Sequence, residues 1–182
     1  MKVNYYNKDM AYADSEEMKN KTNSFMRRKL NFFWTIEKIT SVKTKKLQFL
    51  GADKIINVVG QAPLIVEEKI RRITRNDILI ELIADDRYYL KAHRGTGWGL
   101  KEYSSDLLLY YFEDTDTGHI FSWKKFQKTL LKNLPIWYPL AQKRKFGYNL
   151  IRAKNVNYSS LNIAIPMKDF LEAYKKSGGI II

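Results

Sequence analysis

The chain has 182 residues, of which 45% are hydrophobic and 14% aromatic, so it is long and apolar enough to form a buried core. It has no cysteine and two histidines, which excludes disulfides, thiolate metal sites and multi-histidine metal sites. Lys and Arg total 32 against 19 Asp and Glu, and the net charge of +13 favours a polyanionic partner, nucleic acid first.

Membrane and secretory segments are not expected. Residues 1–17 lack the apolar core of a signal peptide, and no run approaches the length of apolar sequence that spans a bilayer. We therefore expect a cytoplasmic protein with no membrane partner.

The first predicted element is a helix within residues 13–30. Asp14 is placed to cap it, Glu17 stands three residues later as in a capping box, and apolar residues recur at helical spacing from Met18 to Leu30. Residues 31–40 fit either an extension of this helix or a strand.

Three strand-like segments follow, over residues 53–59, 63–73 and 77–84. Their short connections predict an antiparallel meander. Because alternate side chains of a strand share a face, Glu67 and Lys69 should point to one side and Glu68 to the other.

The remaining elements are predicted from apolar patterning. Residues 104–114 and 118–123 indicate two strands, and Ser122 is placed to cap a helix that Pro135 and Pro139 should end. A short strand ending at Pro166 and a short helix follow, and residues 177–182 fit either a frayed end or an edge strand. We expect one α/β domain with a mixed central sheet flanked by α-helices.

One group of charged residues points to chemistry. Asp53 begins one predicted strand, and Glu67 and Lys69 lie on the next. If these strands form a hairpin, two carboxylates and an ammonium converge. Two hard oxygen donors suit Mg²⁺, and a neighbouring lysine suits a water molecule or a phosphate, which are the groups that phosphodiester hydrolysis requires.

The pattern of Asp53, a gap of thirteen residues, and then Glu67-Glu68-Lys69 resembles the PD-(D/E)xK nuclease superfamily. The preceding "LQFLGAD" and the following "IRR" are similar to its small phage-like and restriction-type members, although Ala52 replaces the proline of the family motif. The resemblance covers residues 14–134.

The resemblance implies a restriction-endonuclease-like fold for a single domain over residues 1–182, with a core at 14–134 and a basic extension at 135–182. It implies a DNA endonuclease that uses Mg²⁺, with Mn²⁺ as a substitute, and that acts as a homodimer. Asp53 and Glu67 would bind the metal, Lys69 would assist catalysis, and an acidic residue of the first helix, Glu17 or Glu16, would add a ligand.

Basic residues near the proposed core are expected to contact nucleic acid. The segment from Lys124 to Lys176 has twelve basic and two acidic residues, and the tract at 142–149 alternates basic with aromatic side chains, as phosphate contact and base stacking require. The expected DNA contacts are Lys124, Lys125, Lys143, Arg144, Lys145 and Arg94.

Several alternatives remain open at this point. The charge fits a codon bias toward lysine; Glu67 and Lys69 fit an ion pair on an exposed sheet face; and Glu17 fits a capping role. Glu81 fits either a structural role or an extension of the acidic site. The alternative function is a non-catalytic nucleic-acid-binding protein with a degenerate nuclease fold.

Overall fold

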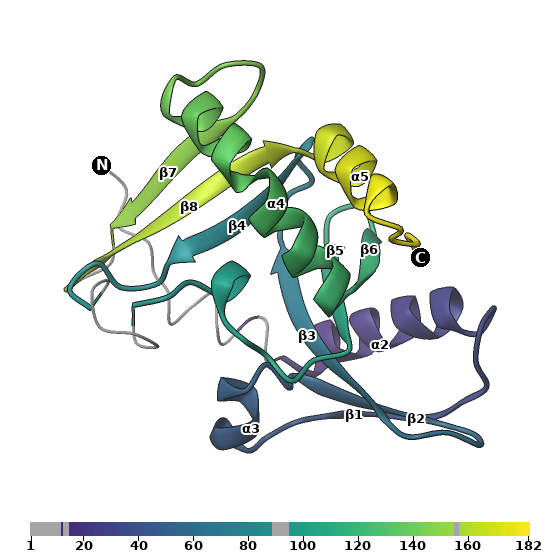
Figure 1. Ribbon diagram of the computed structural model, residues 1–182. Coiled ribbons are helices and arrows are strands. Elements are labelled where there is room, and N and C mark those ends of the chain that lie inside the picture. The colour runs from purple at the N-terminus through teal and green to yellow at the C-terminus, as the bar shows by residue number, and fades with distance from the viewer. Residues whose placement is uncertain (1–11, 13–14, 89–94, 155–156) are drawn as a thin grey trace. The chain divides into compact units, whose positions relative to one another are not determined.

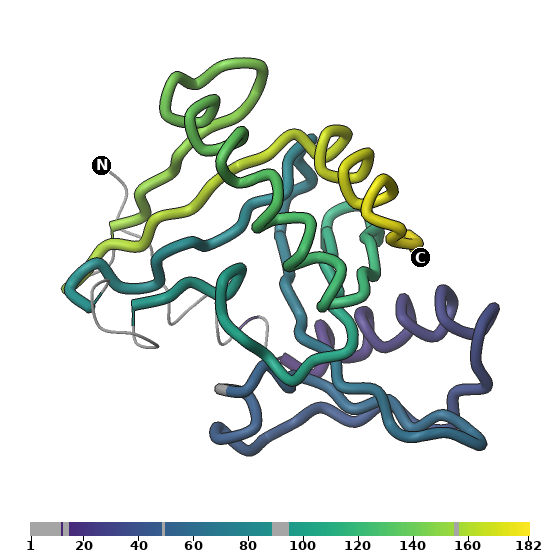
Figure 2. Tube along the Cα trace, viewed as in Figure 1, coloured from purple at the N-terminus to yellow at the C-terminus, as the bar shows by residue number. Residues whose placement is uncertain are grey.

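The structure is a computed structural model that describes residues 12, 15–88, 95–154 and 157–182 (Figures 1 and 2). The chain forms two compact units. The first unit contains the described residues within 9–74, 102–126 and 179–182; the second contains those within 75–101 and 127–178. Among the described residues, no helix is long and apolar enough to cross a membrane.

The first unit is built on a five-stranded mixed sheet. Its strand order is β1-β2-β3-β5-β6, with β3 and β5 parallel and all other neighbours antiparallel. Its elements are α2 (Glu16–Leu30), β1 (Ile36–Ser41), α3 (Lys45–Phe49), β2 (Lys54–Val58), β3 (Leu64–Arg71), β5 (Leu107–Phe112) and β6 (Thr117–Ser122). The predicted mixed sheet of an α/β fold with flanking helices is confirmed.

Helix α2 covers one face of this sheet (Figure 1). Its buried side chains include Met18, Phe25 and Leu30, which form a common core with apolar residues of every strand in the sheet. Its N-cap is Ser15, whose hydroxyl accepts the Met18 N–H, so the prediction of Asp14 as the cap was wrong by one residue. The helix consequently begins at Glu16. Glu16 and Glu17 lie in its first turn, where their negative charge interacts favourably with the helix dipole.

Strand alternation divides the charged residues of β2 and β3 between two faces. Lys54 pairs with Val66, and both lie on the face that α2 covers. Glu68 is two residues after Val66 and shares this face, whereas Glu67 and Lys69 point to the opposite face. The alternation predicted for Glu67, Glu68 and Lys69 is therefore confirmed.

The second unit is built on a three-stranded antiparallel sheet of order β4-β8-β7. Helix α5 packs on it, and the rings of Trp137, Phe170 and Tyr174 follow one another in the core. Its elements are β4 (Asp77–Ile83), η1 (Trp98–Leu100), α4 (Trp123–Gln142, in this unit from Gln127), β7 (Asn149–Lys154), β8 (Ser159–Pro166) and α5 (Met167–Lys176).

The predicted composition of the meander was wrong. The segment at 77–83 pairs with β8 instead of β3, and the third strand of the meander is β1, which comes from the ambiguous stretch before residue 41. The far edge of β3 is taken by β5, whose six residues are all buried and therefore require an interior position in the sheet.

The predicted end of α4 was also wrong, because the helix continues through Pro135 and Pro139 to Gln142. Each proline removes a helical hydrogen bond. Trp137 and Ala141 are nevertheless buried, so apolar packing along this turn of the helix offsets that loss.

Candidate functional site

The site lies at the start of β2, beside the longer strand β3. β2 begins at Lys54, opposite Val66, so it does not extend along the last residues of β3. Asp53 fills this position. Its N–H donates to the Val66 carbonyl over 2.9 Å, and its Oδ2 accepts the Glu68 N–H over 2.8 Å. The Asp53 carboxylate therefore satisfies a strand edge that would otherwise need another strand.

A glycine turn sets the direction of Asp53. Gly51 has φ +83°, and a Cβ at this position would lie 2.4 Å from Cγ of Tyr103. The segment carrying Tyr103 is tied to the same turn, because Ser104 donates to the Leu50 carbonyl over 3.1 Å and Ser105 Oγ donates to the Gly51 carbonyl over 2.6 Å. Only glycine combines this backbone angle with this close approach.

Asp53, Glu67 and Lys69 form one group, here called the carboxylate cluster. Glu67 is 2% exposed, and its Oε1 accepts a hydrogen bond from Lys69 Nζ. Burial raises the pKa of Glu67 to about 7; Lys69 opposes this rise, and the neighbouring Asp53 carboxyl adds to it by charge and by hydrogen bonding. The interpretation of Glu67 and Lys69 as an exposed surface pair does not fit this burial.

The pKa of Lys69 is raised. Burial acts against this rise, but the Glu67 and Asp53 carboxylates outweigh it, and the Tyr103 phenol adds to their effect. Lys69 is thus an ammonium at neutral pH, a hydrogen-bond donor with no capacity to accept a proton.

A second charged group lies on the α2 side of the same strands. Lys54 is 1% exposed; its Nζ donates to Thr22 Oγ1 and Asn23 Oδ1, each over 2.7 Å, and lies 3.4 Å from Glu68 Oε1. Burial lowers the pKa of Lys54 and raises that of Glu68, while each opposes the shift of the other. The pair anchors β2 and β3 to α2 directly behind the carboxylate cluster.

A cavity of about 630 Å³, here called the Asp53 cavity, opens beside these residues. Its walls come from α2, the end of β1, α3 and the facing parts of β2 and β3. The lining residues are Glu16, Lys19, Ser41, Val42, Lys43, Lys45, Gln48, Asp53, Lys54, Glu68, Lys69 and Ile70.

The acidic residues of α2 divide between two cavities. Glu16 lines the Asp53 cavity. Glu17, the predicted additional ligand, is exposed, forms an ion pair with Lys21 over 2.8 Å, and borders a different cavity of about 490 Å³ together with Glu113 and Asp116. The structure therefore brings Asp53, Glu67 and Lys69 together and places Glu17 elsewhere.

The predicted nucleic-acid contacts are dispersed over the chain. Lys124 and Lys125 are exposed in the first turn of α4, in the first unit. The exposed turn after α4, which belongs to the second unit, carries Lys143, Arg144 and Lys145. Arg94 lies outside the described residues. Glu81, which was considered as an acidic extension, lies on β4 in the second unit, where its carboxylate accepts the Trp98 N–H over 3.4 Å.

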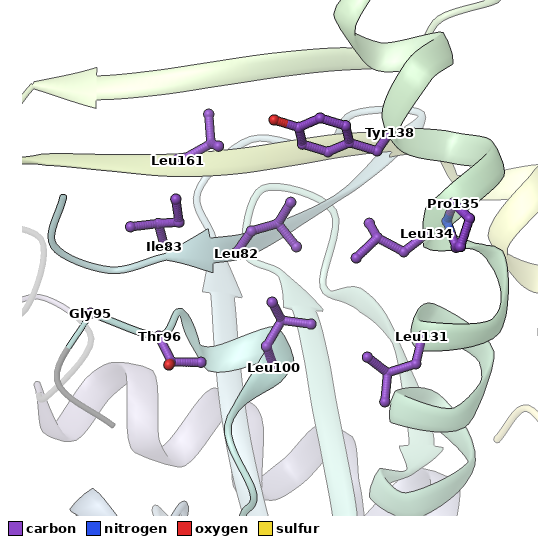
Figure 3. Close-up of a pocket in the computed structure, with 10 residues that line it drawn as sticks. All are labelled: Leu82, Ile83, Gly95, Thr96, Leu100, Leu131, Leu134, Pro135, Tyr138 and Leu161. Atoms are coloured by element: carbon purple, nitrogen blue, oxygen red, sulfur yellow. The ribbon is translucent and has the colours of Figure 1, made fainter. Parts of the chain in front are cut away.

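The second unit has a cavity of its own, of about 560 Å³ (Figure 3). Figure 3 shows leucine and isoleucine side chains from β4, β8 and α4 around it, with the Tyr138 hydroxyl and the Thr96 side chain as polar groups. The described residues of its walls offer neither a carboxylate nor an ammonium group, so it lacks the charged side chains that line the Asp53 cavity.

Sequence reasoning missed several residues of the site. Lys54 had a detectable signal, because it occupies a core-facing position in a strand whose other core-facing residues are Ile56 and Val58. Tyr103 had none, since it reaches Lys69 only through the fold. Helical geometry offered no means of choosing Glu16 over Glu17 before the position of the sheet was known.

The donor set of the cluster fits a divalent cation of the Mg²⁺ type. Within the described residues, no three acidic or histidine side chains gather as a metal-binding group, so the protein donors of the cluster are the carboxylates of Asp53 and Glu67. Mg²⁺ commonly takes one or two protein carboxylates and completes its shell with water and substrate phosphate. The Asp53 carboxyl raises the pKa of Glu67, and a cation between the two carboxylates would offset this repulsion.

Comparison with known proteins adds no assignment: no protein-family model, curated protein or solved structure gives a significant match.

Proposed function

We propose that this protein is a Mg²⁺-dependent nuclease that hydrolyses phosphodiester bonds in DNA and that its first unit is a restriction-endonuclease-like core. The observation that carries the proposal is the convergence of Asp53, Glu67 and Lys69 at the open edge of β3.

Asp53 and Glu67 would hold the metal ion. When bound, the ion would supply positive charge for the phosphate and lower the pKa of a bound water molecule. Mn²⁺ would substitute for Mg²⁺ because it prefers similar oxygen ligands.

Each side chain of the cluster then has a separate role. Asp53 is held by the Glu68 N–H and keeps its carboxylate in place before any ligand arrives. Glu67 must lose its proton to bind a cation, and its raised pKa means that this loss occurs near neutral pH. Lys69 remains charged, so it donates hydrogen bonds to an attacking water molecule or to a phosphate oxygen and stabilises the negative charge of the transition state.

One observation favours the alternative function. The Lys69 ammonium already compensates the Glu67 carboxylate, so this ion pair is complete without a metal ion. In a non-catalytic nucleic-acid-binding protein with a degenerate nuclease fold, such a pair would serve only to stabilise the fold.

Cleavage of supercoiled plasmid in Mg²⁺, in Mn²⁺ and in EDTA separates the two functions. The nuclease proposal predicts nicking that requires the metal ion and that falls about 100-fold or more in Asp53→Asn, which removes a metal ligand but keeps the side-chain shape. Glu37→Gln, on an exposed residue of β1, is the matched control and should retain activity. Absence of cleavage on DNA and RNA would leave the binding function; equal cleavage by Asp53→Asn would refute the site.

A further inference from the structure

We propose that Lys43 and Lys45 form a phosphate-binding rim on the Asp53 cavity and that this rim holds the backbone of one polynucleotide strand next to the bond that is cut. This inference rests on the proposed function and specifies the substrate position. Neither lysine belongs to the basic tracts at 124–125 and 143–145 from which DNA contacts were expected.

Lys43 and Lys45 differ from the other lysines of the cavity in having no acidic partner within the described part of the chain. Five lysines line it, and three of them have acidic partners: Lys54 lies 3.4 Å from Glu68, Lys19 lies 3.6 Å from Glu16, and Lys69 is paired with Glu67. Among the residues that the structure describes, Lys43 and Lys45 have no carboxylate within ion-pair distance, and both are exposed. The surplus positive charge of the cavity therefore lies on these two side chains.

The backbone that carries this rim is fixed to the carboxylate cluster. The Val42 N–H donates to the Asp53 carbonyl over 2.8 Å, and the Gln48 side chain donates to the Val42 carbonyl over 2.8 Å. Lys43 follows Val42 directly, and Lys45 begins α3. The two ammonium groups are thus attached to a segment whose position relative to Asp53 is set by hydrogen bonds.

The chemistry of the cavity favours a polymeric phosphate. Asp53 and Glu68 repel a lone anion from the inner wall, while Lys43 and Lys45 attract anionic groups along the same opening. A strand that places one phosphate at the metal site presents its neighbouring phosphates to such a rim. A cavity of about 630 Å³ is in the size class of small-ligand sites, so it accommodates a short stretch of one strand and not a duplex.

The test is the salt dependence of DNA binding. Anisotropy of a short fluorescein-labelled single-stranded DNA is measured with Asp53→Asn protein and with the same protein carrying Lys43→Gln and Lys45→Gln, both in EDTA, which removes the metal ion that cleavage would require. Loss of two phosphate contacts predicts a decrease of about 1.4 in the slope of log affinity against log salt and affinity about 25-fold lower at about 0.1 M salt. Lys175→Gln with Lys176→Gln, which removes the same charge from the end of α5, is the control and should show neither change.

The outcomes separate this inference from the proposed function. An unchanged slope in the Lys43 and Lys45 variant overturns the rim, even if the parent protein cleaves DNA. A reduced slope together with no cleavage by the parent in Mg²⁺ or Mn²⁺ supports the rim and refutes the nuclease. If inorganic phosphate or thymidine monophosphate competes as strongly as the oligonucleotide, the polymeric ligand class is wrong. In a cleaving parent, the two substitutions should raise KM and leave kcat within about threefold.

Discussion

The backbone N–H of Glu68 donates a 2.8 Å hydrogen bond to Oδ2 of Asp53. Through this bond, the middle residue of the Glu67-Glu68-Lys69 segment fixes the carboxylate that the two outer residues approach. The Glu68 side chain meanwhile points to the opposite face and meets Lys54 beneath α2. One residue of β3 therefore serves the site with its backbone and the core of the first unit with its side chain.

The Lys54 and Glu68 pair should be strongly coupled in stability. Lys54→Met leaves a buried carboxylate without its cation, and we expect the free energy of unfolding to fall by about 3 kcal/mol. Lys54→Met combined with Glu68→Leu should recover most of this loss, because no buried charge then remains. Urea denaturation of the double-mutant cycle measures the coupling, and additive losses would show that the pair is not coupled.

The buried carboxylate of Glu67 should make stability depend on pH in the absence of metal. Its pKa is about 7 in the folded protein against an ordinary 4.5, so the folded state binds the proton more tightly. The Glu67 contribution to the free energy of unfolding therefore falls as pH rises from about 4.5 to about 7, by about 3 kcal/mol in total, and stays low above that range.

Glu67→Gln tests this pH dependence because it mimics the protonated side chain. Unfolding by urea in EDTA should show the variant more stable than the parent at pH 8 and similar to it at pH 4.5. Glu37→Gln on β1 should show no such change. An equal effect of Glu67→Gln at both pH values would contradict the raised pKa.

Lys69 should affect metal binding and cleavage in opposite directions. Its ammonium competes with a metal ion for Glu67, so Lys69→Met, which keeps the apolar stem, should bind Mn²⁺ more tightly in calorimetry. The same variant should cleave DNA about 100-fold more slowly, because it lacks the donor that stabilises the transition state. Parallel loss of Mn²⁺ affinity and cleavage would instead indicate that Lys69 only supports the structure.

The turn at Gly51 should tolerate no side chain. Gly51→Ala combines a φ of +83° with a 2.4 Å approach to Tyr103, and we expect a loss of at least about 3 kcal/mol in the free energy of unfolding. Gly60→Ala is the matched control, because Gly60 has φ +79° and open space within 4 Å, so it should lose only about 1 kcal/mol. Similar losses at the two positions would show that the contact with Tyr103 adds nothing.

The sequence was most informative about segments whose burial is uniform or regular. The all-apolar run at 107–112 predicted a buried strand, and alternation in β3 predicted the separate faces of Glu67 and Glu68. It was least informative about pairing. β4 alternates as a strand should, but its partner β8 lies some eighty residues later, and no local pattern specifies a pairing at that separation.

The residues of the site likewise divide into those that the sequence predicted and those that it did not. Asp53 directly precedes β2, and Glu67 and Lys69 lie on the neighbouring antiparallel strand β3, so spacing and alternation were sufficient to bring them together. Glu16, Lys43 and Lys45 line the cavity from α2, from the residues after β1 and from α3, and Tyr103 lies against the turn at Gly51. The positions of these segments depend on the packing of the whole first unit. Such residues become visible only in the folded chain.

The position of a divalent metal ion in crystals soaked with Mn²⁺ tests the central claim most directly. If Asp53 and Glu67 bind the metal ion, an anomalous peak lies between them, with a carboxylate oxygen of each at a ligand distance of about 2.1 Å and with Lys69 released from Glu67. A fully soaked crystal with no peak at these two carboxylates, or with a peak only at other acidic residues, would contradict it.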